Sequence, residues 1–559
     1  MVPRFRKSAA FAFVLALLST LAAAQLQIGS SNTAFADPTV PHPNTTPCKV
    51  VLFKGFKFDN FTPQTFPYTP PAGCAAPWAK VVLEADFSIT EGNQYDRTAN
   101  IWIGPTNIYF GTTSEPDANL GRHWHVERDL TDYSSIFTVP QDGAVDLFNL
   151  YNKTYNGLLH GTATLYFYPL PPNQAAPFVA DQVIGFSSGS TGGTVGLGNP
   201  ATLLEQTLTL PTNIESIFFD VFAQGQSTDE FWYSCVPNDI AGELNDCGST
   251  GFRESEITID GTPAGVAPIY PWIFTGGIDP FLWIPIPGVQ TMNFKPYQVN
   301  LTPFAALLDD GNPHTIAVSV FNADNYFSAT AALRLYLDQG STQITGAVTT
   351  NTLTVPNPVI VENLNTKPDG SIVGTVSTKS THNFEISGYA NTSHGLITTT
   401  VKQEINFSNL QYFKATNTQF EQNIKQGNTV HSVVTSKNPT ATIVTTVNHD
   451  WPLVLDINYL VAPDGSAAET TTSNQFFEAD EAARRNGIAT TFAEAQNRVI
   501  TTDTLNFDSS GNFTGNSNMS SSQKYFGADS TGYCYSRSIT AASNVLTSIT
   551  DGVGCTGTK

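Results

Sequence analysis

Two short segments combine carboxylates with basic or aromatic neighbours in a chain in which only 13% of residues are charged. The first, EGNQYDRTANIWIG, places Tyr95, Asp96 and Arg97 just before a strand-like run. The second, STDEFWYSC, places Glu230 beside a cluster of aromatic residues. Desolvation beside aromatic rings raises the pKa of a carboxylic acid, whereas a neighbouring arginine lowers it. Two acids with separated pKa values suit general acid–base catalysis.

Each segment also has a purely structural interpretation. Asp96 and Arg97 can form a salt bridge that closes a turn, an interaction of small energetic value at a surface. The aromatic residues Trp232 and Tyr233 can belong to a core that Glu230 merely caps. The residues alone leave both interpretations open beside the catalytic one.

A third segment, RHWHVERD, contains a histidine pair. In a strand the side chains of His123, His125 and Glu127 lie on one face, and two histidines at this spacing can bind a metal. The alternative is an outward polar face. Because no companion ligands are signalled elsewhere, we expect neither a metal nor another cofactor. Motifs of serine hydrolases, zinc proteases and P-loop proteins do not occur.

The N-terminus has the pattern of a secretory signal peptide. Basic residues precede an apolar run at positions 9–21, and small residues provide a cleavage site near Ala24. This run is too short for a membrane span. We therefore expect residues 1–24 to be removed and the protein to be secreted or periplasmic, with no membrane association.

Export favours disulfide bonds among the six cysteines. Six cysteines permit about 15 pairings. Proximity in the sequence favours three of them: Cys48 with Cys74, Cys235 with Cys247, and Cys534 with Cys555.

The formal net charge of −21 excludes nucleic acid as an expected partner, because such a surface repels phosphates. An acidic environment would reduce the self-repulsion of this charge. We expect a monomer.

Alternating Thr, Val, Ile, Phe and Tyr, interrupted by Gly, Pro and Asn, predict an all-β chain of β-sandwiches or jelly rolls. Proline-rich and composition breaks predict a loose leader at residues 25–44, an N-terminal jelly roll at 45–170 and a second jelly roll at 178–340. A third β-rich domain is expected at 341–559. The Ala- and charge-rich residues 478–485 predict a helix.

A longer ordered pattern points to one protein family. The strings GNQYDR, SEP, TYNGLLHGTATLYFYP, DEFWY and PWIFTGGIDPFLWIPI occur in this order within residues 47–340. On these strings the chain resembles the peptide-N4-(N-acetyl-β-glucosaminyl)asparagine amidases, or peptide N-glycosidases, and most closely their acid-active A type.

The resemblance implies two adjacent jelly rolls with an active site in the cleft between them. Residues 96–100, DRTAN, are similar to Asp-Arg-Tyr-Ala-Asn of the F type, which implies that Asp96 is the catalytic acid/base. The EFW string at 230–232 is similar to a Glu-Trp pair and implies that Glu230 is the second carboxylate. A further F-type glutamate falls near Asn152 or Lys153, so no carboxylate transfers there.

The implied function is hydrolysis of the β-aspartylglucosamine amide bond of N-glycosylated peptides or proteins, which releases the N-glycan and converts Asn to Asp. Two alternatives stay open: a glycoside hydrolase that uses the same carboxylate pair, and a non-catalytic glycan-binding sandwich. The expected substrate contacts are Tyr95, Arg97, Trp232, Tyr233, Arg253 and Trp272.

Overall fold

Antiparallel strands carry almost the whole fold, which confirms the all-β class. The computed structural model describes residues 26–199 and 201–555; the expected signal peptide lies outside them. Among the described residues every helix falls short of the length and apolar character that a membrane crossing requires. The helical segments are short: α1 (Asn238–Leu244), α2 (Ala305–Leu308) and the 3-10 helices Thr131–Thr138, Ser227–Phe231, Pro280–Trp283 and Thr302–Phe304.

The first sandwich consists of two four-stranded sheets, with strand orders β1-β8-β3-β6 and β2-β7-β4-β5. Eight strands in two such sheets form a jelly roll. The strands are β1 (Cys48–Phe58), β2 (Gln64–Tyr68), β3 (Trp78–Ile89), β4 (Thr98–Ile103), β5 (Thr106–Thr112), β6 (Arg122–Asp129), β7 (Gln141–Leu147) and β8 (Leu159–Pro169).

The second sandwich repeats this topology, with orders β10-β17-β12-β15 and β11-β16-β13-β14, and β9 added beside β17. Strands β14 and β15 are therefore both edge strands. The strands are β9 (Gln182–Phe186), β10 (Val195–Leu197), β11 (Leu204–Leu208), β12 (Ile214–Gln226), β13 (Glu254–Ile259), β14 (Thr262–Pro268), β15 (Tyr297–Asn300), β16 (His314–Phe321) and β17 (Tyr326–Leu337).

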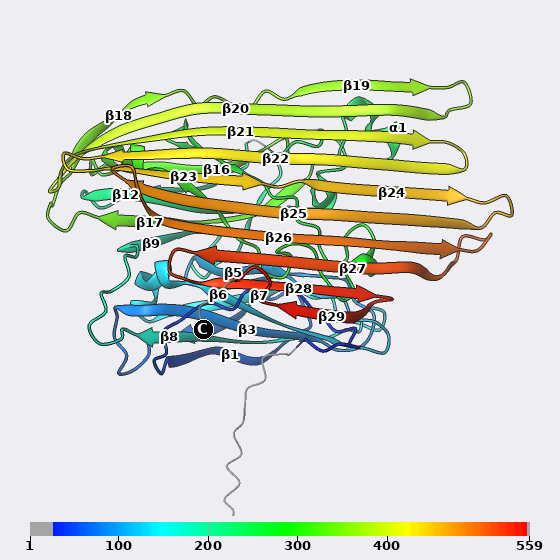
Figure 1. Cartoon of the computed structure of the whole chain (residues 1–559), viewed down its shortest axis with the longest axis horizontal. Helices are drawn as coiled ribbons and strands as arrows, with labels where there is room; N and C mark the ends of the chain where they lie inside the picture. The colour runs from blue at the N-terminus through cyan, green and yellow to red at the C-terminus, as the bar shows by residue number, and fades with distance from the viewer. Residues whose placement is uncertain (1–25, 200, 556–559) are drawn as a thin grey trace, which may run out of the picture.

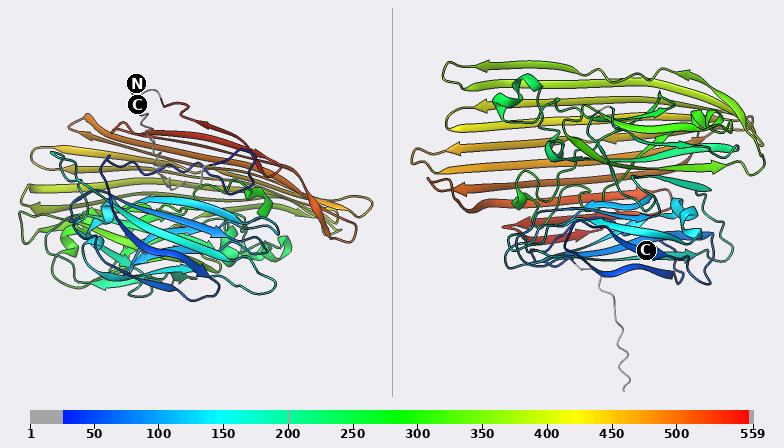
Figure 2. Two further views of the ribbon diagram at one scale, coloured as in Figure 1. Left: turned by 90° about the horizontal axis from the view of Figure 1, so that it is seen from below. Right: turned by 180° about the vertical axis from the view of Figure 1, so that it is seen from behind.

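A 12-stranded antiparallel sheet follows and lies as one layer over both sandwiches (Figures 1 and 2). Its strands are β18 (Thr345–Asn351), β19 (Val359–Thr366), β20 (Ile372–Thr392), β21 (Gly395–Ala415), β22 (Gln419–Lys437), β23 (Thr442–Asp450), β24 (Leu453–Val461), β25 (Ala467–Arg485), β26 (Ile488–Phe507), β27 (Phe513–Asp529), β28 (Cys534–Ala542) and β29 (Val545–Asp551).

The helix predicted at residues 478–485 is wrong: this segment is the end of β25 and pairs with β23 and β26. Intrinsic helix propensity is a weak preference, and pairing on both sides overrides it here.

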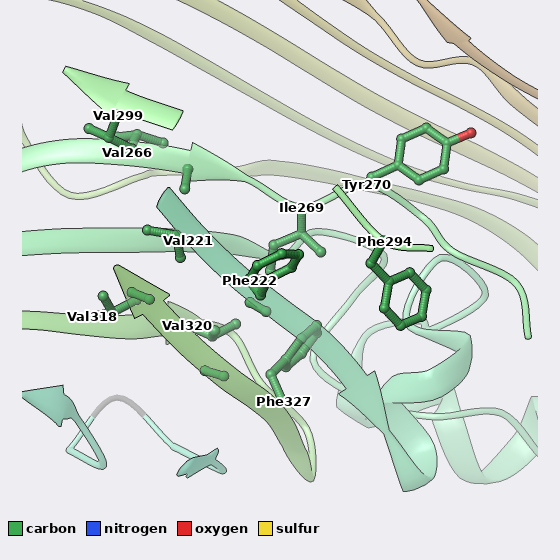
Figure 3. Packing of buried hydrophobic residues seen from close by; sticks show 14 of the residues in the cluster. Val221, Phe222, Val266, Ile269, Tyr270, Phe294, Val299, Val318, Val320 and Phe327 are labelled. Carbon is green, nitrogen blue, oxygen red and sulfur yellow. The ribbon is translucent and has the colours of Figure 1, made fainter. Parts of the chain in front are cut away.

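The second sandwich and the large sheet share one hydrophobic core. Figure 3 shows part of it, including Val221, Phe222 and Phe294 from the second sandwich. Trp451, Leu453 and other residues of the large sheet belong to the same cluster. The first sandwich has a core of its own, which Met292 and Tyr336 of the second sandwich join. The three expected disulfides are present: Cys48–Cys74, Cys235–Cys247 and Cys534–Cys555.

The segment before β1 is packed rather than loose. Ala34 and Ala36 are buried. The Ala34 amide donates to the Pro285 carbonyl at 2.8 Å, and the Ala36 amide donates to Gln523 Oε1 at 2.6 Å. The sequence missed this because the segment has no regular strand pattern, and its contacts come from distant parts of the chain.

Candidate active site

The corner of the first sandwich that precedes β4 is held by backbone hydrogen bonds to the chain that follows β5. The Arg97 amide donates to Thr113 Oγ1 at 2.8 Å, and the Thr113 amide donates to the Arg97 carbonyl at 2.9 Å. Two residues further on, Glu115 Oε1 accepts a hydrogen bond from the Asp96 amide at 3.0 Å. The β4–β5 pairing thus brings Glu115 beside Asp96.

Arg97 also lies in this corner, but within the described residues it forms no ion pair with Asp96. Its Nη2 donates to Gln94 Oε1 at 2.8 Å. The buried Gln94 amide in turn donates to the carbonyls of Leu150 and Gly157. The guanidinium is therefore held near the carboxylates by a neutral partner, and the salt-bridge interpretation of the turn is not what the structure contains.

The 3-10 turn Ser227–Phe231 presents two adjacent acids with different roles. Asp229 is fully buried and accepts hydrogen bonds from Arg253 Nε at 2.9 Å and from the Asp324 and Asn325 amides at 2.9 and 2.7 Å. Glu230 is half-buried, and its carboxylate makes no hydrogen bond or ion pair in the part of the chain that the structure describes. Asp229 therefore fixes the turn, whereas the Glu230 carboxylate takes no part in holding it.

Gly276, in the loop of the second sandwich between β14 and β15, touches the carboxylates of the first. Its backbone amide lies close enough to Asp96 to lower the pKa of that carboxyl. A Cβ at this position would lie 2.4 Å from Glu115 Oε1 and 2.5 Å from Asp96 Oδ1. The neighbouring Thr275 Oγ1 donates to the Thr113 carbonyl at 2.6 Å. Only a residue without a side chain allows this approach.

Burial shifts the pKa values of all three acids upward, and repulsion by neighbouring carboxylates adds to the shift of Glu115 and Glu230. Burial raises the pKa of Asp96 to about 6, against lowering by Arg97 and by the Gly276 amide. Burial raises the pKa of Glu115 to about 8, and the charge of Asp96 adds to this. Burial raises the pKa of Glu230 to about 8, with further contributions from Asp96 and Glu115. The three carboxyl groups therefore form one electrostatically coupled cluster across the two sandwiches.

Four residues expected to contact substrate are buried instead: Trp232, Tyr233, Arg253 and Trp272. The ring of Trp232 packs against Phe407 of β21, with centroids 6.3 Å apart. The ring of Trp272 packs against Phe294 at 4.5 Å. The large sheet covers this side of the second sandwich, so these aromatic residues are core, and Arg253 is the internal partner of Asp229.

Tyr95 is the most exposed of the expected contact residues, with 55% of its surface exposed. Its ring lies 5.3 Å from that of Tyr155, at an angle of 45°. Tyr155 follows Asn152, whose Oδ1 caps a turn by accepting from the Thr154 and Tyr155 amides. Two aromatic rings therefore border the carboxylate cluster on the side of the first sandwich.

The histidine pair does not form a metal-binding group. His125 lies between Asp86, at 2.8 Å, and Glu127, at 3.4 Å, and His123 contacts Asn32. Among residues 26–199 and 201–555, the one group spaced to hold a metal ion is Glu215, Asp338 and His394. Asp338 there already accepts hydrogen bonds from Ser393 and Gly340, so it serves a turn.

Sequence reasoning missed Glu115 as a site residue. Its string, SEP, contributed to the family resemblance, but nothing local distinguishes this glutamate from other loop acids. The signal that could have found it is the hairpin: two short strands in succession return the chain after β5 to the residues that precede β4. Glu115 supplies a third carboxylate where Asn152 and Lys153 supply none.

Comparison with known proteins identifies the family to which the chain belongs. The family model described as peptide N-acetyl-β-D-glucosaminyl asparaginase amidase A matches residues 37–353. A curated relative, peptide-N4-(N-acetyl-β-glucosaminyl)asparagine amidase A of Prunus dulcis, is 31% identical over 400 residues, which cover 67% of this chain and 69% of the relative. The chain belongs to the peptide N-glycosidase A family. This confirms the resemblance inferred from the sequence.

Solved structures give weaker likenesses. PNGase F of Flavobacterium meningosepticum has a TM-score of 0.34 at 14% identity, over 52% of this chain and 96% of that one. The structure of PNGF-II has a TM-score of 0.35 at 11% identity, over 52% of this chain and 66% of that one.

The close approach of Gly276 predicts a sharp effect of one added methyl group. Gly276→Ala should displace the Asp96 and Glu115 carboxylates and lower kcat/KM on a glycopeptide by on the order of 10²-fold. Gly277→Ala is the matched control, because its Cβ would meet nothing closer than the Phe274 carbonyl at 3.2 Å. Equal rates for the two variants, both folded by circular dichroism, would contradict the assigned geometry.

The raised pKa of Glu230 predicts a pH-dependent stability. The ordinary pKa of a glutamate, which applies to the unfolded chain, is 4.5, and burial raises the pKa of Glu230 to about 8 in the folded chain. Between these values the folded protein retains a proton that the unfolded chain releases, so the free energy of unfolding falls as pH rises. The Tm of the wild type should therefore fall more steeply from about pH 5 to 8 than that of Glu230→Gln.

Thermal melts at a series of pH values measure this difference. Glu205→Gln, at an exposed position of β11, is the control and should follow the wild type. Parallel curves for wild type and Glu230→Gln would show that Glu230 titrates normally.

Proposed function

We propose that this protein hydrolyses the β-aspartylglucosamine amide bond of N-glycosylated peptides or proteins, using Asp96, Glu115 and Glu230. The observation that carries the proposal is the meeting of these carboxyl groups across two sandwiches, in a chain of the peptide N-glycosidase A family. The products are aspartate in the peptide and a released glycosylamine. The protein acts as a secreted or periplasmic monomer.

The separated pKa values support a division of labour. Near neutral pH Asp96 is ionised, whereas Glu115 and Glu230 hold protons. Asp96 accepts a proton from the attacking water, whose oxygen bonds to the side-chain carbonyl carbon. A protonated glutamate donates to the departing nitrogen as the carbon–nitrogen bond breaks. Arg97, close enough to lower the pKa of Asp96 and Glu115, stabilises negative charge on the carbonyl oxygen.

The border of the cluster supports a sugar as the bound group. Tyr95 and Tyr155 offer flat apolar faces at the solvent side of the cluster, and aromatic rings combine apolar area with a polar hydroxyl. Tyr95 contacts the sugar, whereas Trp232, Tyr233 and Trp272, also expected to contact substrate, are buried.

The decisive experiment is digestion of an N-glycopeptide followed by mass spectrometry of the peptide. Conversion of Asn to Asp supports the amidase; a peptide that retains N-acetylglucosamine indicates a glycoside hydrolase, and an intact glycopeptide indicates a binding protein. Asp96→Asn should lower the rate by about 10²–10⁴-fold through lost acid–base catalysis. Asp142→Asn, an exposed residue of β7, is the control.

Folded Asp96→Asn protein that retains near wild-type activity would refute the role of Asp96. Glu115→Gln, assayed beside it, separates the two neighbouring acids. A loss for Glu115→Gln alone would transfer the proton-accepting role from Asp96 to Glu115.

The chemistry of three carboxyl groups predicts independence from metal ions. Incubation with EDTA, followed by gel filtration, should leave the rate of glycopeptide hydrolysis unchanged. A rate that is abolished by EDTA and restored by zinc would contradict this mechanism.

A further inference from the structure

A cavity of about 400 Å³ lies between the second sandwich and the large sheet. Residues of β14 and β15, the edge strands of the two sheets of the sandwich, line it. Asp96, Glu115 and Glu230 do not line it. The cavity is therefore distinct from the candidate active site, and its volume falls within the roughly 300–1,000 Å³ of small-molecule sites.

Aliphatic residues form part of the floor of the cavity. Val221 and Ala223 of β12 reach it from the sandwich interior, Val299 from β15 and Ile269 from the segment after β14. Figure 3 shows Val221, Ile269 and Val299 among the buried residues of this core. Such a surface favours apolar parts of a ligand.

The roof consists of side chains on one face of the large sheet. Strand register places Val401 opposite Val434, and Val434 opposite Thr445; all three line the cavity. The next row on the same face, Gln403, Ser432 and Val447, also lines it. Because side chains alternate between faces, Val433 and Thr446 point to the other side of the sheet.

Buried polar atoms without partners lie in this lining. Trp272 Nε1, Trp451 Nε1 and Ser255 Oγ are buried donors with no hydrogen bond among the described residues, and each residue lines the cavity. A buried donor that lacks an acceptor costs free energy. An acceptor atom carried by a bound molecule would satisfy such a donor.

The pKa values of the ionisable groups that line the cavity are all shifted in the direction that favours the neutral form. Burial lowers the pKa of His449 to about 4 and also lowers the pKa of Lys295. Burial raises the pKa of Glu481. The same burial would penalise a charge on a bound molecule.

We propose that this cavity binds an uncharged, predominantly apolar small molecule that carries one or more hydrogen-bond acceptors. The apolar floor receives its hydrocarbon or aromatic body, and the indole and hydroxyl donors receive its acceptor atoms. The large sheet is an essential wall of the site, so the cavity exists only in the full chain.

Fluorescence titration with N-phenyl-1-naphthylamine, an uncharged aromatic probe, tests the proposal on the full-length protein. The wild type should bind the probe saturably at one site. Val434→Trp should fill the cavity and weaken binding by about 10-fold or more. Val433→Trp places the same side chain on the opposite face of the same strand and should bind like the wild type.

Absence of saturable binding, or equal binding by Val434→Trp and Val433→Trp, would overturn the proposal. If Val434→Trp does not fold, Thr445→Trp and its opposite-face control Thr446→Trp give the same test one strand away. N,N′-diacetylchitobiose should not displace the probe. Displacement by this sugar would overturn the apolar class and make the cavity a glycan site.

Discussion

The contact between the Gly276 backbone and the Asp96 and Glu115 carboxylates constrains the rest of the site. The loop that carries Gly276 continues along β5 of the first sandwich. Its Thr291 carbonyl accepts from the Thr112 amide at 3.0 Å, and its Phe294 amide donates to the Phe110 carbonyl at 2.9 Å. One loop thus joins the sandwiches and completes the carboxylate cluster. A shift in how the sandwiches pack would move Gly276, and the acids of the first sandwich would lose their partner from the second.

Three carboxyl groups in a half-buried cluster oppose folding whenever more than one is ionised, because like charges repel strongly where water is partly excluded. The surrounding structure holds them there. Asp229 and Arg253 form a buried ion pair whose remaining polar atoms are satisfied by backbone groups. A pair satisfied in this way fixes geometry, although burying two charges contributes little net stability. The turn that presents Glu230 is rigid for this reason.

The sequence predicts the fold class and both sandwiches, because alternation and turn residues are local signals. It predicts the disulfides because each cysteine lies near its partner in the sequence. Their unusual neighbours also mark Asp96 and Glu230 as candidates, and the family resemblance implies the role of each. Glu115 was not, since its importance arises only when β5 returns the chain to Asp96. The local sequence predicts that the aromatic residues beside Glu230 contact substrate, but packing against the distant β21 makes them part of the core. The prediction of a helix at the Ala-rich end of β25 is wrong for a similar reason, because sheet pairing outweighs local helix propensity.

The polar composition of the C-terminal region has a structural explanation in the same site. The Asn409 and Gln411 amides, both buried, donate to the Tyr233 and Cys235 carbonyls just after Glu230, at 2.8 and 2.9 Å. Buried Gln475 donates to the Pro271 carbonyl at 2.6 Å, near Gly276.

An irregular loop beneath a sheet must have its backbone polar groups satisfied, and an aliphatic face could not do this. The Asn and Gln side chains of the large sheet therefore donate the hydrogen bonds that water would otherwise donate to backbone carbonyls, in both loops that complete the cluster. The third β-rich region therefore belongs to the architecture of the candidate site.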